Sequence, residues 1–224
     1  MRKKMLGFMF VFCILLHPVR VYVKEETSNQ SFPLSGVTIV LDAGHGYPDH
    51  GAMACDINES EINLILVNKI KTRLRKAGAI VILTRKNEFD LANNKVSNRK
   101  RYDMKKRAKI INNKKTDLFL SIHLNAYPSS MVKGSQVYYR KKDEQGKALA
   151  NIIQTNLKKI NETLMVPKYG DYFILNKTLP IGVLVECGFI SNPIDRANLC
   201  QESYQNKIAD CLFNAIKEYL NMLQ

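Results

Sequence analysis

Residues 37–46, Val-Thr-Ile-Val-Leu-Asp-Ala-Gly-His-Gly, join a short β-branched apolar run to a histidine that stands between two glycines. Such a run is typical of a buried strand, and the glycines allow the backbone to turn sharply and to approach a ligand closely. An ordinary buried histidine requires neither feature. The stretch therefore predicts a strand that places His45 at a ligand-binding edge.

Four more short apolar runs resemble this strand, and four segments carry helical spacing. The predicted strands are Val37–Leu41, Ile80–Leu83, Leu118–Ile122, Gln136–Tyr139 and Val183–Val185, and the predicted helices are 59–76, 102–113, 144–162 and 203–222. Strands that alternate with helices indicate a three-layer α/β fold, in which helices cover both faces of a mostly parallel sheet. Ligands of such sheets bind at the carboxyl ends of the strands.

The chain has 224 residues, 46% of them apolar, which is enough for one domain with a single core. Residues 1–23 are predicted to be an export leader, because a basic start precedes the apolar stretch Met5–Leu16, which is too short to span a bilayer. The cleavage signal is poor, so both a signal peptide and an uncleaved N-terminal membrane tether stay open. We assign residues 24–35 to a linker and 36–224 to the functional domain, which we expect to act outside the cytoplasm.

The chain is strongly basic, with 34 Lys+Arg against 20 Asp+Glu. Removal of the leader takes away four cations and no acid, leaving a net charge of +10. This charge favours a polyanionic partner, and export makes nucleic acid the weakest candidate. Residues 93–109 hold eight cations against the single acid Asp103, so this segment is either a solvated loop and helix face or a contact to substrate or partner.

Four cysteines lie beyond the predicted leader: Cys55, Cys187, Cys200 and Cys211. Their spacing matches neither a metal-binding pair nor the dense disulfide framework of a small secreted domain. We therefore expect free and mostly buried thiols.

A second histidine and a carboxylate directly follow two other predicted strands. His123 comes after Leu118–Ile122, and Glu186 comes after Val183–Val185. The ends of parallel strands meet at one edge of a sheet, so we expect both side chains near His45. Since a buried carboxylate is unfavourable without a partner, Glu186 either pairs with a buried arginine such as Arg85 or acts as a general base beside a metal.

Two histidines suit Zn²⁺, and a catalytic zinc site usually has three protein ligands and one open position. The candidates for the third ligand are Asp49, Asp56, Glu59 and Glu61. We predict that Asn58 caps the helix and that Glu61 reaches back to the Asn58 amide in a capping box. Glu59 instead falls within the apolar stripe of the helix, where an inward charge needs a ligand.

These residues resemble the zinc-dependent N-acetylmuramoyl-L-alanine amidases of bacterial cell walls. The resemblance spans about residues 36–222, and it rests on the motifs Leu41-Asp42-Ala43-Gly44-His45-Gly46, Glu59-Ser60-Glu61-Ile62-Asn63-Leu64, Thr84-Arg85, Ser121-Ile122-His123-Leu124-Asn125-Ala126 and Glu186-Cys187-Gly188-Phe189-Ile190-Ser191-Asn192. It implies that His45, Glu59 and His123 bind zinc and that Glu186 is the catalytic carboxylate. The implied reaction is hydrolysis of the amide between N-acetylmuramic acid and L-alanine of the peptidoglycan stem peptide.

Two positions depart from the family pattern. Tyr47 replaces a glycine and could narrow the cleft or stack on a sugar, and Cys187 would place a thiol beside the zinc. We predict Tyr47, Asn125 and Arg85 as substrate contacts.

Within the family, the chain resembles the germination-specific amidases of endospore formers, because it has a short leader, a lone catalytic domain and the inserted basic segment. This resemblance implies action on spore cortex, in the wall or the intermembrane space of the developing spore, where it would prepare muramic residues for δ-lactam formation. Because the catalytic domain stands alone, we also expect another exported protein to place or activate it. The alternatives are a vegetative autolysin of the same class, a zinc peptidase, a thiol hydrolase using Cys187 with His123, and a non-enzymatic polyanion-binding protein.

Overall fold

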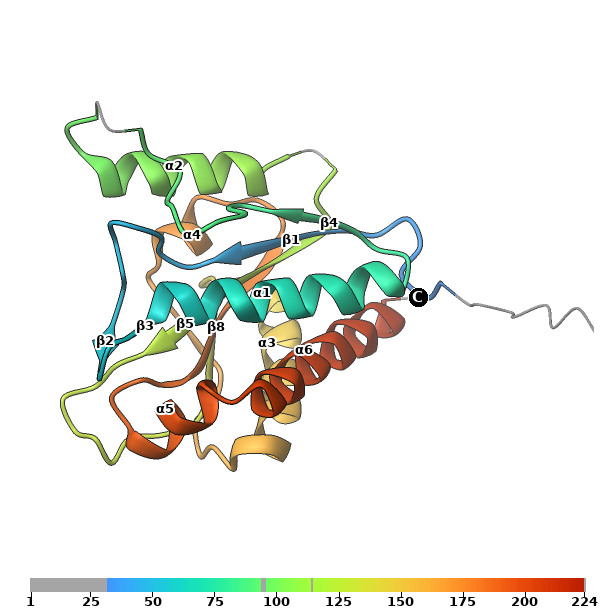
Figure 1. Ribbon diagram of the computed structural model, residues 1–224. Helices are drawn as coiled ribbons and strands as arrows, with labels where there is room; N and C mark the ends of the chain where they lie inside the picture. Colours follow the sequence, from blue (N-terminus) through green and yellow to red (C-terminus); the bar gives the residue numbers. More distant parts are fainter. Residues whose placement is uncertain (1–31, 94–95, 114, 224) are drawn as a thin grey trace, which may run out of the picture. The chain divides into compact units, whose positions relative to one another are not determined.

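The computed structural model describes residues 32–93, 96–113 and 115–223 of the chain (Figure 1). The predicted leader, residues 1–23, lies outside these ranges, as do residues 24–31 of the predicted linker. Leu34 is fully buried in the core, and its N–H donates to the Ala77 carbonyl at 2.9 Å. Residues 32–35, which we had assigned to the linker, are therefore part of the domain.

The centre of the domain is a six-stranded sheet of order β4-β1-β5-β8-β6-β7. Its strands are β1 (Thr38–Ala43), β4 (Ile80–Leu83), β5 (Leu118–Asn125), β6 (Gln136–Tyr139), β7 (Lys168–Tyr169) and β8 (Ile181–Phe189). Strands β4, β1, β5 and β8 are mutually parallel, β6 runs antiparallel to β8, and β7 is parallel to β6. A separate two-stranded hairpin pairs β2 (Met53–Ala54) with β3 (Ile57–Asn58). The prediction of a mostly parallel sheet is confirmed.

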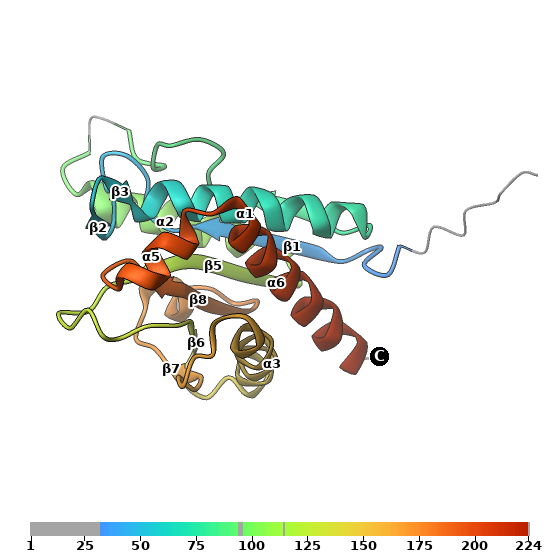
Figure 2. The same ribbon diagram turned by 60° about the horizontal axis from the view of Figure 1, so that its bottom comes forward.

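Helices cover both faces of this sheet (Figures 1 and 2). Helices α1 (Glu59–Lys76), α3 (Glu144–Asn161) and α6 (Glu202–Met222) pack together over one face, and α5 (Pro193–Leu199) lies beside α6 and β8. The short α4 (Phe173–Asn176) and α2 (Arg99–Ile111) cover the other face. The predicted three-layer α/β architecture is thus confirmed. None of the helices within the described ranges has the length and apolarity that a membrane span requires.

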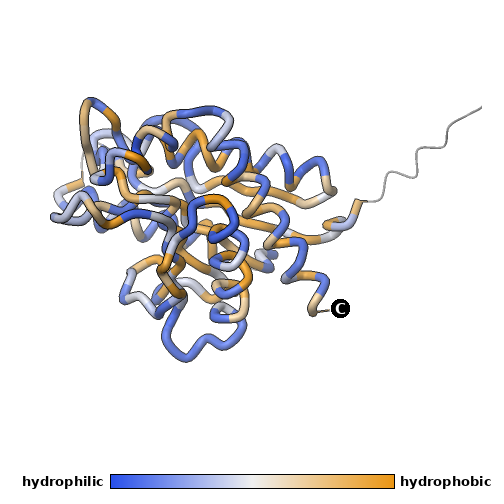
Figure 3. The backbone as a smooth tube through the Cα atoms, turned by 90° about the horizontal axis from the view of Figure 1, so that it is seen from below, coloured by the Kyte–Doolittle hydropathy of each residue, from blue (hydrophilic) through white to orange (hydrophobic). Residues whose placement is uncertain are grey.

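The periodicity of the sequence explains how these layers meet. In α1, the predicted stripe of Ile62, Leu66, Ile70 and Leu74 is buried against the sheet. Figure 3 shows the same alternation of hydrophobic and hydrophilic residues along the helical turns of the chain. Strand β1 is buried along its whole length, as expected for a strand with helices on both faces.

Strands β5 and β8 are longer than predicted. Apolarity ends at Ile122 and Val185, but β5 continues to Asn125 and β8 to Phe189, and His123 pairs in register with Glu186. These two side chains therefore lie within neighbouring strands and not after them, because ladder hydrogen bonds continue where the apolar pattern stops. This pairing brings the two groups to the same part of the sheet.

Candidate metal centre

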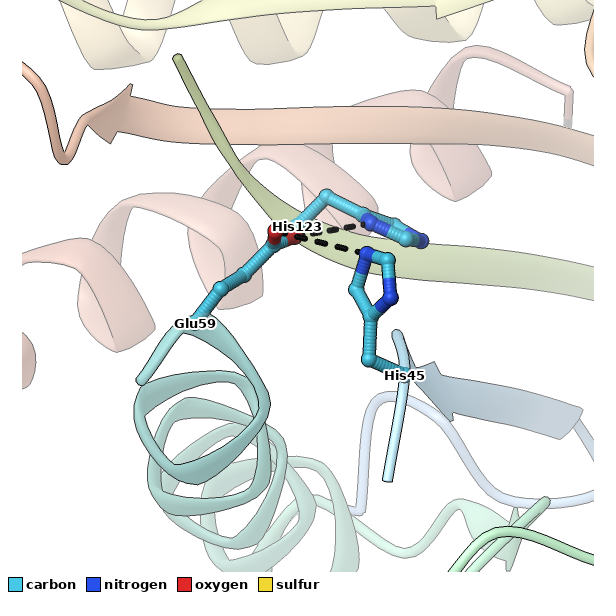
Figure 4. A group of neighbouring side chains, drawn as sticks. All are labelled: His45, Glu59 and His123. Atoms are coloured by element: carbon cyan, nitrogen blue, oxygen red, sulfur yellow. Dashed lines mark hydrogen bonds and ion pairs between the residues drawn. The ribbon is translucent and has the colours of Figure 1, made fainter. Parts of the chain in front are cut away.

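Three of the predicted residues meet at the carboxyl edge of the sheet. His45 follows β1, Glu59 opens α1, and His123 lies near the end of β5. One ligand atom from each lies within 4.8 Å of the other two. Figure 4 shows the Glu59 carboxylate facing both imidazole rings, 3.3 Å from His45 Nε2 and 3.0 Å from His123 Nδ1.

The Glu59 carboxylate is held in place by the backbone. Its Oε2 accepts a hydrogen bond from the Ala52 N–H at 2.8 Å, and its Oε1 accepts one from the Leu124 N–H at 3.0 Å. The Asn63 amide, one turn along α1, also donates to Oε1 at 3.3 Å. The helix-face argument that singled out Glu59 agrees with this geometry, since the residue is only 3% exposed.

Glycines make room for the imidazole rings. A Cβ on Gly44 would collide with the His123 ring, and a Cβ on Gly51 would lie 2.5 Å from Glu59 Oε2 and 2.7 Å from the His45 ring. His45 itself has a left-handed backbone, with φ of 60°. Its Nδ1 lies 2.9 Å from Asp49 Oδ2, which fixes the ring orientation. Asp49, one of the four candidates for the third ligand, thus contacts the ring of the candidate ligand His45 at Nδ1, and the other ring nitrogen faces Glu59.

The electrostatics of this group favour a positive charge at its centre. Burial alone lowers the pKa of His45, but the hydrogen bonds to Asp49 and Glu59 outweigh it and raise that pKa to about 9. Burial likewise raises the pKa of Glu59, yet its bonds to His123 and His45 bring the pKa well below its ordinary value. A bound metal would replace these protons. Two imidazoles and one carboxylate form a ligand set that suits catalytic zinc.

A charged network lies directly beneath the centre, on the face covered by α2. The buried Arg107 guanidinium donates to Asp42 Oδ1 at 2.8 Å, to Asp103 Oδ2 at 2.7 Å and to the His45 carbonyl. The Ser121 and Thr84 hydroxyls also donate to Asp42, each at 2.6 Å. Sequence reasoning missed this role, because Arg107 looked like one more cation of the basic run at 93–109. Its helical register with Asp103, at i and i+4, could have revealed the pair.

Glu186 faces the same cavity as the three ligand candidates. Its side chain is buried, and its Oε2 has no hydrogen-bond partner among the described residues. Burial raises the pKa of Glu186 to about 7, although His123 opposes the rise. The alternative of an ion pair with Arg85 is wrong: the Arg85 guanidinium donates to the carbonyls of Ala43, Gly44, Ser60 and Asn87.

Two of the predicted substrate contacts receive no support from this geometry. The N–H groups of Arg85 donate to backbone carbonyls of the loops around the centre, and the residue is only 2% exposed. Asn125 lies at the end of β5, and its Oδ1 accepts a hydrogen bond from the Ala126 N–H at 2.8 Å. Tyr47 differs from both, because its ring is 51% exposed beside the centre.

The expected capping box of α1 is wrong in its details. Asn58 does occupy the N-cap position, but its side chain caps no backbone N–H. Its side-chain amide instead donates to Glu61 Oε1 at 2.7 Å, so the contact joins the half-buried Asn58 to the exposed Glu61.

The expectation for the cysteines is only partly met. The thiols of Cys55, Cys187, Cys200 and Cys211 are free, but Cys55 and Cys200 are exposed. Cys187 is fully buried in the apolar cluster beneath α1, α3 and α6. Since neighbouring residues of a strand point to opposite faces, Cys187 faces away from the cavity that Glu186 enters. It therefore does not place a thiol beside the metal centre.

An α/β sheet with two imidazoles, one ligand carboxylate and a second, unpaired carboxylate at its edge is the arrangement of a metal-dependent hydrolase. The chain belongs to the N-acetylmuramoyl-L-alanine amidase family, whose model matches residues 39–218.

Relatives of known name place the chain more narrowly within this family. It is 37% identical to the germination-specific N-acetylmuramoyl-L-alanine amidase of Bacillus subtilis, over 98% of this chain and 96% of that protein. Its structure resembles the CwlD amidase of Clostridioides difficile, solved in complex with the GerS lipoprotein. That match has a TM-score of 0.80 at 35% identity and covers 83% of this chain and 99% of that one. It also resembles the catalytic domain of the amidase CwlV of Bacillus (Paenibacillus) polymyxa var. colistinus, with a TM-score of 0.73 at 30% identity, covering 83% and 98% of the two chains.

Proposed function

We propose that this peptidoglycan amidase uses a zinc ion, held by His45, Glu59 and His123, to cleave the amide between N-acetylmuramic acid and L-alanine. The observation that carries the proposal is the Glu186 carboxylate, whose buried and unpartnered Oε2 faces the cavity that also holds the three ligands. Burying such an atom without a partner costs free energy, and a role in the reaction would account for it.

Zinc would supply Lewis acidity, because it polarises a carbonyl and lowers the pKa of water. Glu186 takes a proton from the attacking water as its oxygen bonds to the lactyl carbonyl carbon. The same carboxyl then gives a proton to the amine of L-alanine as the C–N bond breaks. A pKa of about 7 lets Glu186 both accept and release a proton near neutrality.

The outer parts of the cavity position the substrate. Tyr172 and Phe173, at the start of α4, line it together with Met104 of α2. These apolar surfaces exclude water from the reacting bond, which strengthens electrostatic interactions inside the cavity.

Two alternative activities fare differently. A thiol hydrolase loses its support, because Cys187 is fully buried and burial raises the pKa of its thiol. A zinc peptidase would use the same ligands and the same base, so the bond that is cut must decide between them. Family membership favours the muramoyl amide.

We further propose that the chain is exported and acts on spore cortex. The support is its 37% identity, over nearly the full length of both chains, to a germination-specific amidase. A deletion strain should then form spores with reduced muramic δ-lactam, measured by mass analysis of cortex muropeptides. Normal δ-lactam content with altered vegetative wall would favour the autolysin alternative.

An exported partner is also part of the proposal. The similar CwlD amidase was solved in complex with a lipoprotein. We propose that this chain likewise works with an accessory lipoprotein outside the cytoplasm. Co-purification from sporulating cells with a tagged chain would test this assembly.

The central experiment measures metal content and products together. The purified protein should release alanyl peptides from muropeptides, lose this activity with a chelator and regain it with Zn²⁺. Glu186→Gln should keep its zinc while turnover falls by roughly 10²–10⁴-fold, as is typical of a lost general base. Glu144→Gln, an exposed position at the start of α3, is the matched control. Cleavage within the peptide, or a metal-free Glu186→Gln protein, would overturn the assignment.

A further inference from the structure

A second hollow lies among the loops that follow β1 and β4 and the first turn of α1. Its lining residues are Tyr47, His50, Ser60, Glu61, Glu88 and Phe89. Tyr47 lies two residues after the ligand His45, and Ser60 and Glu61 directly follow the ligand Glu59. The hollow is therefore formed by the same loop and the same first turn of α1 that carry His45 and Glu59.

The backbone presents the two aromatic rings of the hollow together. The Tyr47 N–H donates to the Glu88 carbonyl at 2.6 Å, and the Asp90 N–H donates to the Tyr47 carbonyl at 3.2 Å, which forms a short parallel bridge between Tyr47 and Phe89. Gly46, with φ of 141°, permits this approach, since a Cβ there would lie 2.8 Å from the Asp90 nitrogen. The rings are thus fixed by two paired loops.

The Tyr47 and Phe89 rings are open to solvent, although backbone hydrogen bonds hold the two loops that carry them. Tyr47 is 51% exposed and Phe89 is 47% exposed, with their ring centroids 5.8 Å apart and nearly perpendicular. The His50 ring lies 5.6 Å from the Tyr47 ring on another side. Adjacent large rings left open to solvent on a rigid backbone are typical of a binding surface.

The charge of the hollow is opposite to that of the whole chain. The chain carries a net charge of +14, yet the only charged side chains among the lining residues are the carboxylates of Glu61 and Glu88. Glu61 accepts one hydrogen bond from the Asn58 amide, and the Glu88 carboxylate has no partner within the described ranges. The hollow therefore repels anions and offers acceptors to hydroxyl and amide donors.

The glycan half and the peptide half of a muramoyl-peptide differ in charge. The lactyl carboxyl of the sugar is consumed in the amide, so the glycan half carries hydroxyl and N-acetyl N–H donors but no charge. The peptide half carries at least its terminal carboxylate. The acidic hollow with its aromatic rings thus fits the glycan half.

We propose that this hollow binds a pyranose ring of the glycan strand. One of the perpendicular rings of Tyr47 and Phe89 stacks on the face of the sugar and the other packs against its edge. Glu61 and Glu88 accept its hydrogen bonds. The inference rests on the proposed function for its choice of ligand. It assigns the β1–β4 side of the metal centre to glycan and leaves the opposite side, toward α4, for the stem peptide.

Binding of a peptide-free sugar tests this inference without the reaction. The probe is the tetrasaccharide of N-acetylglucosamine, titrated into the full chain and followed by calorimetry. Tyr47→Ala and Phe89→Ala should each weaken its binding about tenfold, equivalent to about 1.4 kcal/mol, while Tyr47→Phe keeps the ring and the affinity. Phe32→Ala is the matched control, because Phe32 is 51% exposed and lies at the far end of α1 beside Gly78.

Kinetics provide the second measurement. With glycan-linked muropeptides, Tyr47→Ala and Phe89→Ala should raise KM about tenfold and leave kcat and zinc content unchanged. Equal sugar affinity in the wild type and both alanine variants would overturn the inference, as would tighter binding of a lysine-bearing peptide than of the tetrasaccharide. A chain that binds the sugar through Tyr47 but releases no alanyl peptide would instead overturn the proposed function alone.

Discussion

The two faces of the sheet are packed by different kinds of side chain. The face under α1, α3 and α6 is packed with aliphatic side chains that form one large cluster. The face under α2 and α4 has a smaller apolar cluster and carries the buried network of Asp42, Arg107 and Asp103. The first face gives the domain its core, and the second supports the loop that carries His45. Stability and site geometry thus depend on opposite sides of one sheet.

The largest effect is expected where the charged face is broken. Arg107→Met leaves Asp42 buried without its cation and frees the His45 carbonyl, so the free energy of unfolding should fall by about 4 kcal/mol. Zinc affinity should fall by roughly 10–100-fold, as for other groups that orient a metal ligand. Denaturant unfolding and zinc titration measure the two effects. Full zinc affinity in folded Arg107→Met would show that the network does not support the site.

A cavity in the apolar face should separate stability from the site. Leu212→Ala, at a fully buried position of α6, should lower the free energy of unfolding by about 3 kcal/mol. Zinc affinity of the folded protein should stay at the wild-type value, because Leu212 belongs to the apolar cluster and does not line the cavity of the three candidate ligands. If zinc affinity fell here as much as in Arg107→Met, the two faces would not have separate roles.

The pH dependence of stability sharpens the same comparison. Burial raises the pKa of Asp42, but Arg107 and the Ser121 and Thr84 hydroxyls outweigh it and lower that pKa below 3.8. A lowered carboxylate pKa stabilises the fold above the ordinary value and loses this effect as the pH falls through the lowered value. The free energy of unfolding of the wild type should exceed that of Asp42→Asn by about 2 kcal/mol at pH 7, and this difference should begin to narrow as the pH falls below about 4. A constant gap in urea unfolding from pH 7 to pH 3 would contradict this prediction.

The smallest effect on stability is expected for Glu61 in the first turn of α1, two residues after Glu59. Glu61→Ala removes only the exposed contact to Asn58, so the free energy of unfolding should change by about 0.5 kcal/mol or less and zinc should stay bound. Glu59→Ala removes a ligand and should lose zinc. Metal analysis of both purified variants checks this, and equal zinc loss would mean that the ligand is misassigned.

The longer elements of the fold could be predicted because each is long enough to show its own pattern of apolar residues. Helix α1 matches its predicted range of 59–76, and β4 and β6 match theirs. The short elements were not, since β2, β3 and β7 have two residues each and exist only through pairing with a neighbour. The ends of β5 and β8 were missed for a related reason: ladder pairing, not apolarity, extends them past Ile122 and Val185.

The candidate site shows the same division. The closeness of His45, His123 and Glu186 could be predicted because chemically distinctive residues follow apolar runs, and the inward direction of Glu59 because its helical face can be calculated. The roles of the four residues stay predictions. The helical spacing of Arg107 could have paired it with Asp103, but its bonds to Asp42 and to the His45 carbonyl could not be predicted, because they join segments far apart in the sequence. The hollow of Tyr47 and Phe89 joins two loops that lie 42 residues apart, a proximity that no local pattern encodes.

The inward direction of Cys187 bears on how the protein reacts with oxidants. Oxidation proceeds through the thiolate, and burial raises the pKa of this thiol while denying access to it. Peroxide or disulfide reagents would therefore react first with the exposed Cys55 and Cys200. Strand alternation at a single position thus shields the residue next to Glu186 from oxidative damage.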